Sequence, residues 1–279
     1  MDGGLHEGAS DVFDLASEVL GVDVVELCSA GRSGEADLGS TRWAQPAVLV
    51  CSVAAFRCLG HDFVALAGQS IGEYAALVSA GAIDLADAIR LVALRAKVTE
   101  EAGERTPGGM AAVMKIDRED VDRICAATGV ALAAENSAGQ YVISGAADVL
   151  DAALEAFSGT KAIVRKLEVS AAFHSPVMAP AKEPLRTALE DVSFSPPTIE
   201  IWSSTTAAPI SDPAEIRTAF VDQLVSPVLW RETVAGASSK HGTTSFVDLG
   251  PGKVVGALAK RIVSGADVSF AADLLGAPA

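Results

Sequence analysis

A serine between two glycines is the part of this chain best suited to do chemistry. The segment 68–72 (GQSIG) follows an apolar run that predicts a strand and precedes a pattern that predicts a helix. This is the setting of a G-x-S-x-G nucleophile elbow, a tight turn that lifts the serine above the edge of a sheet. Residues without a Cβ fit best on either side of such a turn, and the helix N-terminus directs the Ile71 N–H at a developing oxyanion. We therefore predict Ser70 as a nucleophile and Ile71 as an oxyanion-hole donor.

The same serine also has a purely structural interpretation. Ser70 and Glu73 form an S-x-x-E sequence, which is the pattern of a capping box in which the serine only ends a helix. Capping does not require a glycine on each side, so the pattern favours the nucleophile.

A serine nucleophile needs a base, and the chain has four histidines. His61 and His241 each precede a predicted strand, which places them at the end of a parallel sheet opposite to the elbow. His6 lies in a terminal segment that we expect to fray. By elimination we predict His174 as the base. No acidic residue stands out as a third member of a triad, and a backbone carbonyl can orient the imidazole instead, so both possibilities stay open.

Arg95 continues the apolar stripe of a predicted helix, following Leu85, Ala88 and Val92 at helical spacing. An arginine in that position needs an anionic partner. One interpretation is a clamp on the carboxylate of a substrate. The other is an arginine that snorkels to the surface or is paired internally.

The elements that position these residues indicate an α/β fold. An unbroken apolar strand at 63–67 lies between helical patterns at 46–60 and 72–81, which is typical of a parallel sheet covered on both faces. A long helix follows from about residue 85 to 103. Later in the chain we predict a helix, a strand, a helical stretch and a last strand, at 178–192, 199–204, 215–224 and 245–250.

A second unit interrupts this pattern. Residues 107–170 read as β-α-β-β-α-β, the ferredoxin-like order. We therefore predict a large, discontinuous α/β-hydrolase-like domain with a central parallel sheet, formed by residues 1–106 and 171–279. A small ferredoxin-like domain of residues 107–170 is inserted into it.

Composition and charge exclude several classes of protein. With 36 acidic against 21 basic residues, the net charge of −15 repels a phosphate backbone and an anionic membrane alike. The longest apolar stretch, residues 46–56, is too short to cross a bilayer, and the N-terminus does not resemble a signal peptide. The four cysteines have no metal-ligand or disulfide spacing. We expect a cytoplasmic globular protein with no metal site, no nucleic-acid partner and no membrane partner.

The sequence resembles the malonyl-CoA:acyl carrier protein transacylase family, the acyltransferases of fatty-acid and polyketide synthesis. The resemblance covers nearly the whole chain, from about residue 12 to 275. It is carried by GQSIGEYAALVSAGAIDLADAIRLVALRAK from Gly68, GGMAAVMKI from Gly108, ENSAGQYVISG from Glu135, AAFHSPVM from Ala171, SPVLWRETV from Ser226 and VDLGPGKVV from Val247.

The resemblance implies a ping-pong transfer of a malonyl group from coenzyme A to the phosphopantetheine thiol of an acyl carrier protein. It implies an acyl intermediate on Ser70, His174 as the base and no cofactor of the enzyme's own. Arg95 matches the arginine that binds the malonyl carboxylate, and Gln45 matches a glutamine of the substrate pocket. Gln223 matches the residue whose backbone carbonyl holds the histidine.

Two positions near the site depart from the family pattern, and one fits it. Gln69, also assigned to the substrate pocket, replaces the histidine usual before the serine. Ala171 replaces a histidine of many malonyl-selective members. Phe173 matches the bulky residue of malonyl-selective members, and its ring would crowd an α-methyl branch. We therefore predict a preference for malonyl over methylmalonyl thioesters, measured by kcat/KM.

A third departure concerns the start of the family pattern. The family opens with an apolar strand and a P-G-Q-G-S turn that supplies a second oxyanion-hole N–H, and neither is present at or after Met1. Loss of one such donor costs about 10²–10³ in rate. We expect that the chain as given begins late and that a fuller form has the strand.

Two alternatives to transfer stay open from the sequence. One is a hydrolase that edits acyl thioesters, and the other is an impaired homologue that only binds a carrier protein. An acidic carrier protein is repelled on average by the negative charge of this chain, so it must dock on a local basic patch. The candidate clusters are Lys161, Arg165 and Lys166, or Lys253, Lys260 and Arg261.

Overall fold

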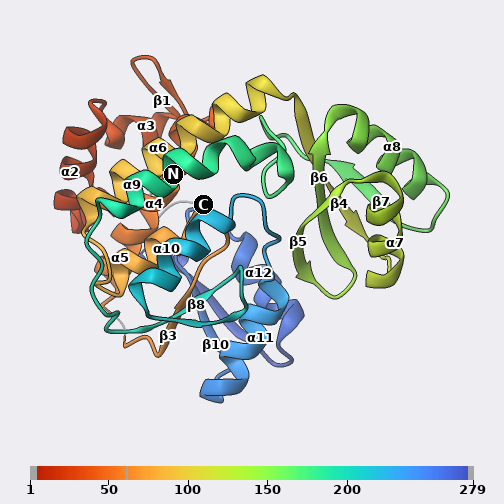
Figure 1. The fold of residues 1–279 in the computed structure, drawn as a ribbon. Coiled ribbons are helices and arrows are strands. Elements are labelled where there is room, and N and C mark those ends of the chain that lie inside the picture. Colours follow the sequence, from red (N-terminus) through yellow and green to blue (C-terminus); the bar gives the residue numbers. More distant parts are fainter. Residues whose placement is uncertain (1–4, 61, 276–279) are drawn as a thin grey trace.

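The protein has two lobes of different size, and the chain enters the smaller one and then returns to the larger (Figure 1). The computed structural model describes residues 5–60 and 62–275. N-terminal helices and the C-terminal part build the larger lobe, while the smaller lobe, in green, lies to one side. The predicted α/β fold with a small inserted unit is confirmed. The exact domain boundaries at residues 107 and 170 stay a prediction.

The strands of the larger lobe form two separate groups. β3 (Ala65–Ala67) pairs in parallel with β8 (Glu200–Ser203), and β9 (Ala208–Ile210) adds an antiparallel edge. β10 (Ser245–Asp248) pairs in parallel with β11 (Asp267–Phe270). Parallel pairing is therefore as expected, but among the described residues no strand joins β3 to β10. The sheet is divided where a continuous one was predicted.

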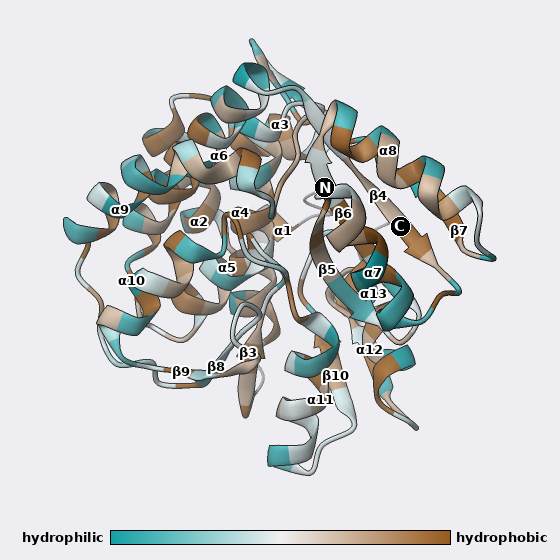
Figure 2. Ribbon diagram, turned by 45° about the vertical axis from the view of Figure 1, so that its right-hand side comes forward, coloured by the Kyte–Doolittle hydropathy of each residue, from teal (hydrophilic) through white to brown (hydrophobic). Residues whose placement is uncertain are grey.

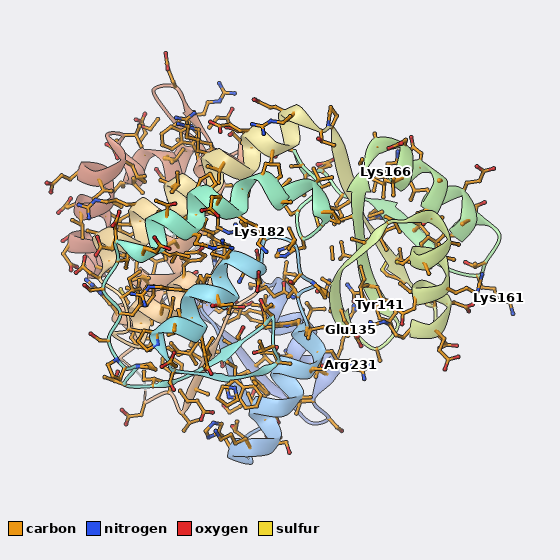
Figure 3. All side chains as sticks on the ribbon, viewed as in Figure 1. Glu135, Tyr141, Lys161, Lys166, Lys182 and Arg231 are labelled. Atoms are coloured by element: carbon orange, nitrogen blue, oxygen red, sulfur yellow. The ribbon has the colours of Figure 1, made fainter. Side chains whose placement is uncertain are left out.

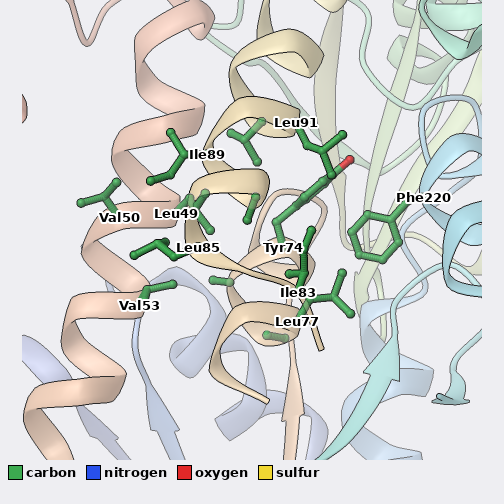
Figure 4. Close-up of a cluster of buried hydrophobic side chains, with 14 of the residues drawn as sticks. Leu49, Val50, Val53, Tyr74, Leu77, Ile83, Leu85, Ile89, Leu91 and Phe220 are labelled. Carbon is green, nitrogen blue, oxygen red and sulfur yellow. The ribbon is translucent and has the colours of Figure 1, made fainter. Parts of the chain in front are cut away.

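Three helices pack together beside β3 and β8, with α5 in contact with the strands and α4 and α6 packed against it. α4 (Thr41–Leu59) and α6 (Leu85–Arg105) are capped by Ser40 and Asp84, whose side chains accept a hydrogen bond from backbone N–H groups of the first turn. α5 (Gly72–Ser79) follows the elbow directly. Their apolar faces meet in the largest core cluster (Figure 4), which contains Leu49, Val50, Val53, Tyr74, Leu77, Ile83, Leu85, Ile89, Leu91 and Phe220.

Further helices and strands complete the larger lobe. Figure 2 shows hydrophilic segments on the outward turns of α9 and α10. Within the part of the chain that the structure describes, no helix is long and apolar enough to cross a membrane. The elements are α1 (Leu5–Gly8), α2 (Ser10–Leu20), α3 (Val24–Ala30), β1 (Arg32–Ser33), β2 (Ala36–Asp37), the 3₁₀ helix η1 (Pro176–Ala181), α9 (Lys182–Glu190), α10 (Pro213–Asp222), α11 (Trp230–His241), α12 (Val254–Ile262) and α13 (Ala271–Leu274).

Three sequence-based assignments of elements were wrong in part. The strand predicted at 63–67 begins only at Ala65. The helix predicted at 178–192 is a 3₁₀ turn followed by α9, because Pro180 has no N–H for a helical hydrogen bond. The strand at 245–250 is not the last one, since β11 follows it, and α11 was not predicted at all.

The smaller lobe is one antiparallel sheet covered by two helices. Its strands lie in the order β5-β6-β4-β7, so the first strand in sequence is central. Both helices pack against the sheet in a second core cluster around Ile143 and Phe157. The elements are β4 (Gly108–Met114), α7 (Arg118–Thr128), β5 (Ala131–Ser137), β6 (Gln140–Ala146), α8 (Ala147–Ser158) and β7 (Ile163–Lys166).

The turn between β3 and α5 requires one of its two glycines for steric reasons. A Cβ at Gly68 would lie 2.0 Å from the backbone carbon of Gly72 and 2.3 Å from the Glu73 nitrogen. A Cβ at Gly72 would meet nothing within 4 Å. The expectation that both glycines permit a close backbone approach is therefore wrong for Gly72.

We expect Gly68→Ala and Gly72→Ala to differ sharply. Gly68→Ala should lower the free energy of unfolding by about 3 kcal/mol, because the new methyl group overlaps backbone atoms that cannot move independently. Gly72→Ala should change it by less than about 1 kcal/mol, since alanine is favoured in a helix. Urea unfolding of both variants measures this, and equal losses would contradict the assignment.

Candidate active site

Ser70 lies at the tip of the turn, where its backbone is held in an uncommon conformation. Its φ of +50° is in the left-handed region, which residues with a Cβ rarely adopt. Its Oγ lies 2.9 Å from Nε2 of His174 and accepts a hydrogen bond of 2.8 Å from Nη2 of Arg95. The turn thus presents one hydroxyl to a base and to a cation together.

The capping-box interpretation of Ser70 is wrong. Oε1 of Glu73 accepts hydrogen bonds from the Ser204 N–H, at 2.7 Å, and from the Ser204 hydroxyl. The position before α5 is Ile71, which makes no side-chain capping bond. Burial raises the pKa of Glu73 to about 7, opposed by its bonds from Ser204. Glu73 therefore ties α5 to the end of β8 instead of capping a helix.

His174 follows the smaller lobe and has a φ of +56°. Its Nδ1 lies 2.9 Å from the Gln223 carbonyl and 3.1 Å from the Ser226 carbonyl. Carbonyl oxygens only accept, so Nδ1 must carry the proton, and the lone pair of Nε2 faces Ser70. In the described residues two carbonyls and no carboxylate hold Nδ1. This geometry decides between the alternatives that the sequence left open.

The electrostatic surroundings keep the His174 imidazole neutral. Burial lowers its pKa to about 4, and the positive charge of Arg95 acts in the same direction. The two carbonyls that accept from Nδ1 oppose this shift, because they favour the protonated ring. At neutral pH the ring is therefore ready to accept a proton from Ser70.

Arg95 is buried, with only 3% of its surface exposed. Its guanidinium donates to neutral oxygens: the Gln45 side chain, Ser70 Oγ, and the Gln223 side chain at 3.3 Å. Burial lowers its pKa, partly offset by Tyr74 and Glu73. No ion pair involving Arg95 forms among the described residues, and its Nε has no hydrogen-bond partner there. A buried cation beside a nucleophile, held by neutral groups, suits an anionic ligand.

The other predicted residues are neighbours of Ser70, His174 or Arg95. Gln45 Nε2 donates to Thr41 at 2.9 Å, which orients its oxygen toward Arg95. Gln69 Nε2 donates to Oδ1 of Asn136 in β5, at 3.0 Å, and so joins the elbow to the smaller lobe. Phe173 is half-buried and packs against core clusters of the larger lobe and of the region between lobes.

Of the three excluded histidines, the structure describes the side chain of His241. His61 and the side chain of His6 lie outside the described residues. His241 contacts Glu200 at 2.8 Å, at the first residue of β8. It lies at the end of the sheet opposite to the elbow, as expected from its position before a strand.

The sequence analysis gave no role to several polar partners of the site. Asn136 and Ser226 lie in the resembling segments ENSAGQYVISG and SPVLWRETV, and Ser204 lies in neither; all three contact the site only through the tertiary fold. Glu73 enters the sequence analysis only through the disfavoured capping interpretation, which gives no hint of its contact with Ser204. Among the described residues no cluster of three histidine, cysteine or acidic side chains is placed to hold a metal ion.

Comparisons with known proteins give the same kind of protein from sequence and from structure. The family described as "Acyl transferase domain" matches residues 14–276. The malonyl CoA-acyl carrier protein transacylase of Haemophilus influenzae is 39% identical over 264 residues, which cover 91% of this chain and 83% of the relative. The structure of malonyl-CoA:acyl carrier protein transacylase from Xanthomonas oryzae pv. oryzae is similar with a TM-score of 0.89 and 37% identity, covering 98% of this chain and 90% of that one. A malonyl-transacylase in complex with a type II PKS acyl-carrier protein is similar with a TM-score of 0.89 and 35% identity, covering 95% and 87%.

The depressed pKa of His174 predicts an unusual pH dependence for Ser70. A protonated imidazole cannot take the serine proton, so the reactivity of Ser70 is lost only as the pH falls through about 4. Labelling of Ser70 by a fluorophosphonate, followed by intact-protein mass spectrometry, should have a constant rate between pH 8 and about 5.5. His174→Ala should abolish it, and Ser70→Ala is the blank. A decline centred near the ordinary histidine pKa of about 6.5 would contradict the assignment.

Proposed function

The chain belongs to the family of acyl transferase domains, and from this premise we propose that it moves a malonyl group from coenzyme A to an acyl carrier protein. One observation carries the proposal. The Ser70 hydroxyl is bonded at once to a neutral imidazole and to a buried guanidinium. The imidazole can activate the serine, and the guanidinium can hold the carboxylate that distinguishes malonyl from unsubstituted acyl groups.

In the first half-reaction Ser70 attacks the thioester carbonyl of malonyl-CoA. Its proton moves to Nε2 of His174 as the Oγ–carbon bond forms, and the Ile71 N–H at the start of α5 stabilises the oxyanion. Collapse of the intermediate breaks the carbon–sulfur bond, and the imidazolium returns the proton to the coenzyme A thiolate. The Gln223 and Ser226 carbonyls stabilise the transient imidazolium through Nδ1–H.

The second half-reaction repeats these steps with the phosphopantetheine thiol of the carrier. His174 takes the thiol proton, the thiolate attacks the acyl-serine ester, and the proton returns to Ser70 Oγ. Both steps use only side chains and backbone groups of this chain and the thiols that its substrates bring. We therefore propose that no resident cofactor takes part, and we place the reaction in the cytoplasm.

Substrate binding should strengthen the base. The Arg95 charge contributes to the low pKa of His174, and a malonyl carboxylate paired with Arg95 would neutralise that charge. The imidazole then accepts the Ser70 proton more readily. The carboxylate thus acts both as the recognised group and as an activator of the nucleophile.

The residues before His174 support a preference for malonyl over methylmalonyl. Phe173 lies half-buried between the two core regions, so its ring is restrained by packing and would crowd an α-methyl group. Ala171 is fully buried, and a Cβ on Gly103 would lie 2.6 Å from its methyl group. The alanine at 171 therefore fills the space beside α6, where an imidazole has no room.

The two alternatives are not favoured. An editing hydrolase for plain acyl groups has no use for a buried guanidinium beside its nucleophile, and a pure binding module has no use for a serine–histidine pair.

For carrier docking, the two basic clusters predicted from the sequence stay candidates. Lys166 and Lys253 are each paired with an acidic side chain, and Lys161 lies on the outer side of the smaller lobe (Figure 3).

A labelling experiment tests the proposed transfer. With ¹⁴C-malonyl-CoA the protein should form a stable adduct on Ser70, and holo acyl carrier protein should remove it much faster than water does. Ser70→Ala should take no label. Rapid discharge to water alone would indicate a hydrolase, and no labelling of the wild-type chain would leave only binding.

Arg95 should determine the choice of acyl group. Arg95→Ala should lower kcat/KM for malonyl-CoA by about 100-fold, since charge-assisted hydrogen bonds contribute about 1.5–3 kcal/mol. The loss for acetyl-CoA should be much smaller. Arg95→Lys keeps the charge without the fork geometry, so its kcat/KM for malonyl-CoA should lie between those of the wild type and Arg95→Ala. Equal losses of kcat/KM for malonyl-CoA and acetyl-CoA in Arg95→Ala would contradict the role of Arg95 as a carboxylate clamp.

A further inference from the structure

β5 of the smaller lobe contacts both parts of the larger lobe that position the serine–histidine pair. Asn136, near the end of β5, accepts a hydrogen bond from Gln69 in the elbow. One residue earlier, the Glu135 N–H donates to the carbonyl of Val228, and the Val228 N–H donates to the carbonyl of Ala133, both at 2.9 Å. Apolar side chains of both lobes pack around this bridge. The smaller lobe therefore braces the elbow and the chain near Val228 together.

The chain near Val228 also holds the base. Residues 223–229, between α10 and α11, form turns and one β-bridge, at Val228. Within this segment the Ser226 carbonyl accepts from Nδ1 of His174, at 3.1 Å. A segment made of turns keeps its position through contacts with its neighbours. The contacts at Val228 and beyond therefore decide where the Ser226 carbonyl lies.

The Glu135 carboxylate joins the two lobes just beyond this segment. Its side chain is only 3% exposed and pairs with two arginines. Nη1 of Arg231, the second residue of α11, lies 3.0 Å from Oε1 of Glu135, at the junction of the lobes (Figure 3). Arg118, the first residue of α7, donates to Oε2. The pair with Arg231 thus crosses between the lobes, whereas the pair with Arg118 stays within the smaller one.

The two ion pairs of Glu135 differ in what they connect. A buried carboxylate is unfavourable unless it is paired, and either arginine alone supplies a counter-charge. The two arginine side chains are similarly exposed, 44% for Arg231 and 41% for Arg118. Removing either one therefore changes the charge around Glu135 in the same way. The loss of Arg231 also removes a tie between β5 and the start of α11.

We propose that Arg231 is a positioning residue for the acyl transfer, because its ion pair with Glu135 holds the segment before α11 against β5. The Ser226 carbonyl in that segment then stays on Nδ1 of His174. Arg231 acts through Glu135 and this segment, and not by contact with the reacting groups. Its role rests on the proposed function, in which His174 is the base.

The Ser226 carbonyl matters most when the ring is charged. As His174 takes the serine proton, the carbonyls of Gln223 and Ser226 both stabilise the imidazolium through Nδ1–H. Hydrogen bonds to a charged group are stronger than neutral ones, so a displaced Ser226 carbonyl slows the proton transfer more than it disturbs the resting site. We therefore expect a loss of rate in a chain that remains folded.

Labelling of Ser70 by a fluorophosphonate at neutral pH tests the proposal with matched variants. Arg231→Gln should lower the labelling rate about tenfold, because one of two acceptors for the imidazolium is weakened. Arg118→Gln removes the other ion pair of Glu135 and should stay within about twofold of the wild type. Arg231→Lys keeps a cation and should lie between the wild type and Arg231→Gln. A wild-type rate in Arg231→Gln would overturn the proposal, and so would equal losses in Arg231→Gln and Arg118→Gln.

The His174 ring gives a readout that a merely structural role would not change. In protein with ¹⁵N-labelled histidine, the Nδ1–H resonance is identified by its loss in His174→Ala. This resonance should move upfield in Arg231→Gln and exchange faster with water, because the hydrogen bond to Ser226 is weakened. Arg118→Gln should leave it unchanged. A lower labelling rate with an unchanged resonance in Arg231→Gln would refute the positioning role.

A double variant tests whether Arg231 acts through Glu135. Glu135→Gln should lower the labelling rate about as much as Arg231→Gln, and the double variant should lose no more than either single variant. Losses that multiply would contradict the proposal, since Arg231 would then act through another contact.

Neither the labelling nor the resonance of His174 involves a thioester. A wild-type chain that fails to transfer malonyl would contradict the proposed function, yet the difference between Arg231→Gln and Arg118→Gln could still be measured. Conversely, equal behaviour of these two variants in a chain that transfers malonyl would refute the role of Arg231 alone.

Discussion

The buried positive charge of Arg95 is the constraint on which the site depends. A guanidinium removed from water is unfavourable unless its donors are satisfied. Here its Nη groups donate only to neutral oxygens, and its Nε has no partner among the described residues. The charge therefore acts on its neighbours: it contributes to the low pKa of His174 and attracts any carboxylate that enters. In the proposed transfer, the same charge would recognise the anionic acyl group and influence the activation of Ser70.

Gln223 connects the two halves of this arrangement. Its carbonyl accepts from His174, and its side-chain oxygen accepts from Arg95. One residue at the end of α10 thus fixes the tautomer of the base and the position of the cation. Glu73 adds a second restraint, because its bonds to Ser204 hold the first turn of α5, and so the elbow, against the end of β8. The nucleophile is placed by buried polar contacts between segments that are distant in sequence.

The elbow could be predicted from the sequence because its requirements are local. A strand, a turn with glycine before the serine and a helix follow one another within a few residues, and the structure shows Gly68 packed against the next turn. His174 was reached by elimination among four histidines, and the fold brings it to Ser70 across 104 positions. Local patterns were least informative where they allow two outcomes. The S-x-x-E pattern permits a cap, which the two glycines already disfavoured, and burial gives Glu73 a different partner. Pro180 interrupts a helical pattern that hydrophobic spacing alone would continue, and there the prediction was wrong.

By itself the sequence determined the α/β class, the inserted β-α-β-β-α-β unit and the elbow at Ser70, because strand and helix periods and turn residues act over short distances. Elimination among the histidines also picked out His174, the one that the fold brings to Ser70. Only the tertiary structure decided what orients His174, what surrounds Arg95 and where the sheet of the larger lobe is divided. Those features depend on hydrogen bonds and burial between remote segments. No pattern of neighbouring residues encodes such contacts, since they exist only after the chain has packed.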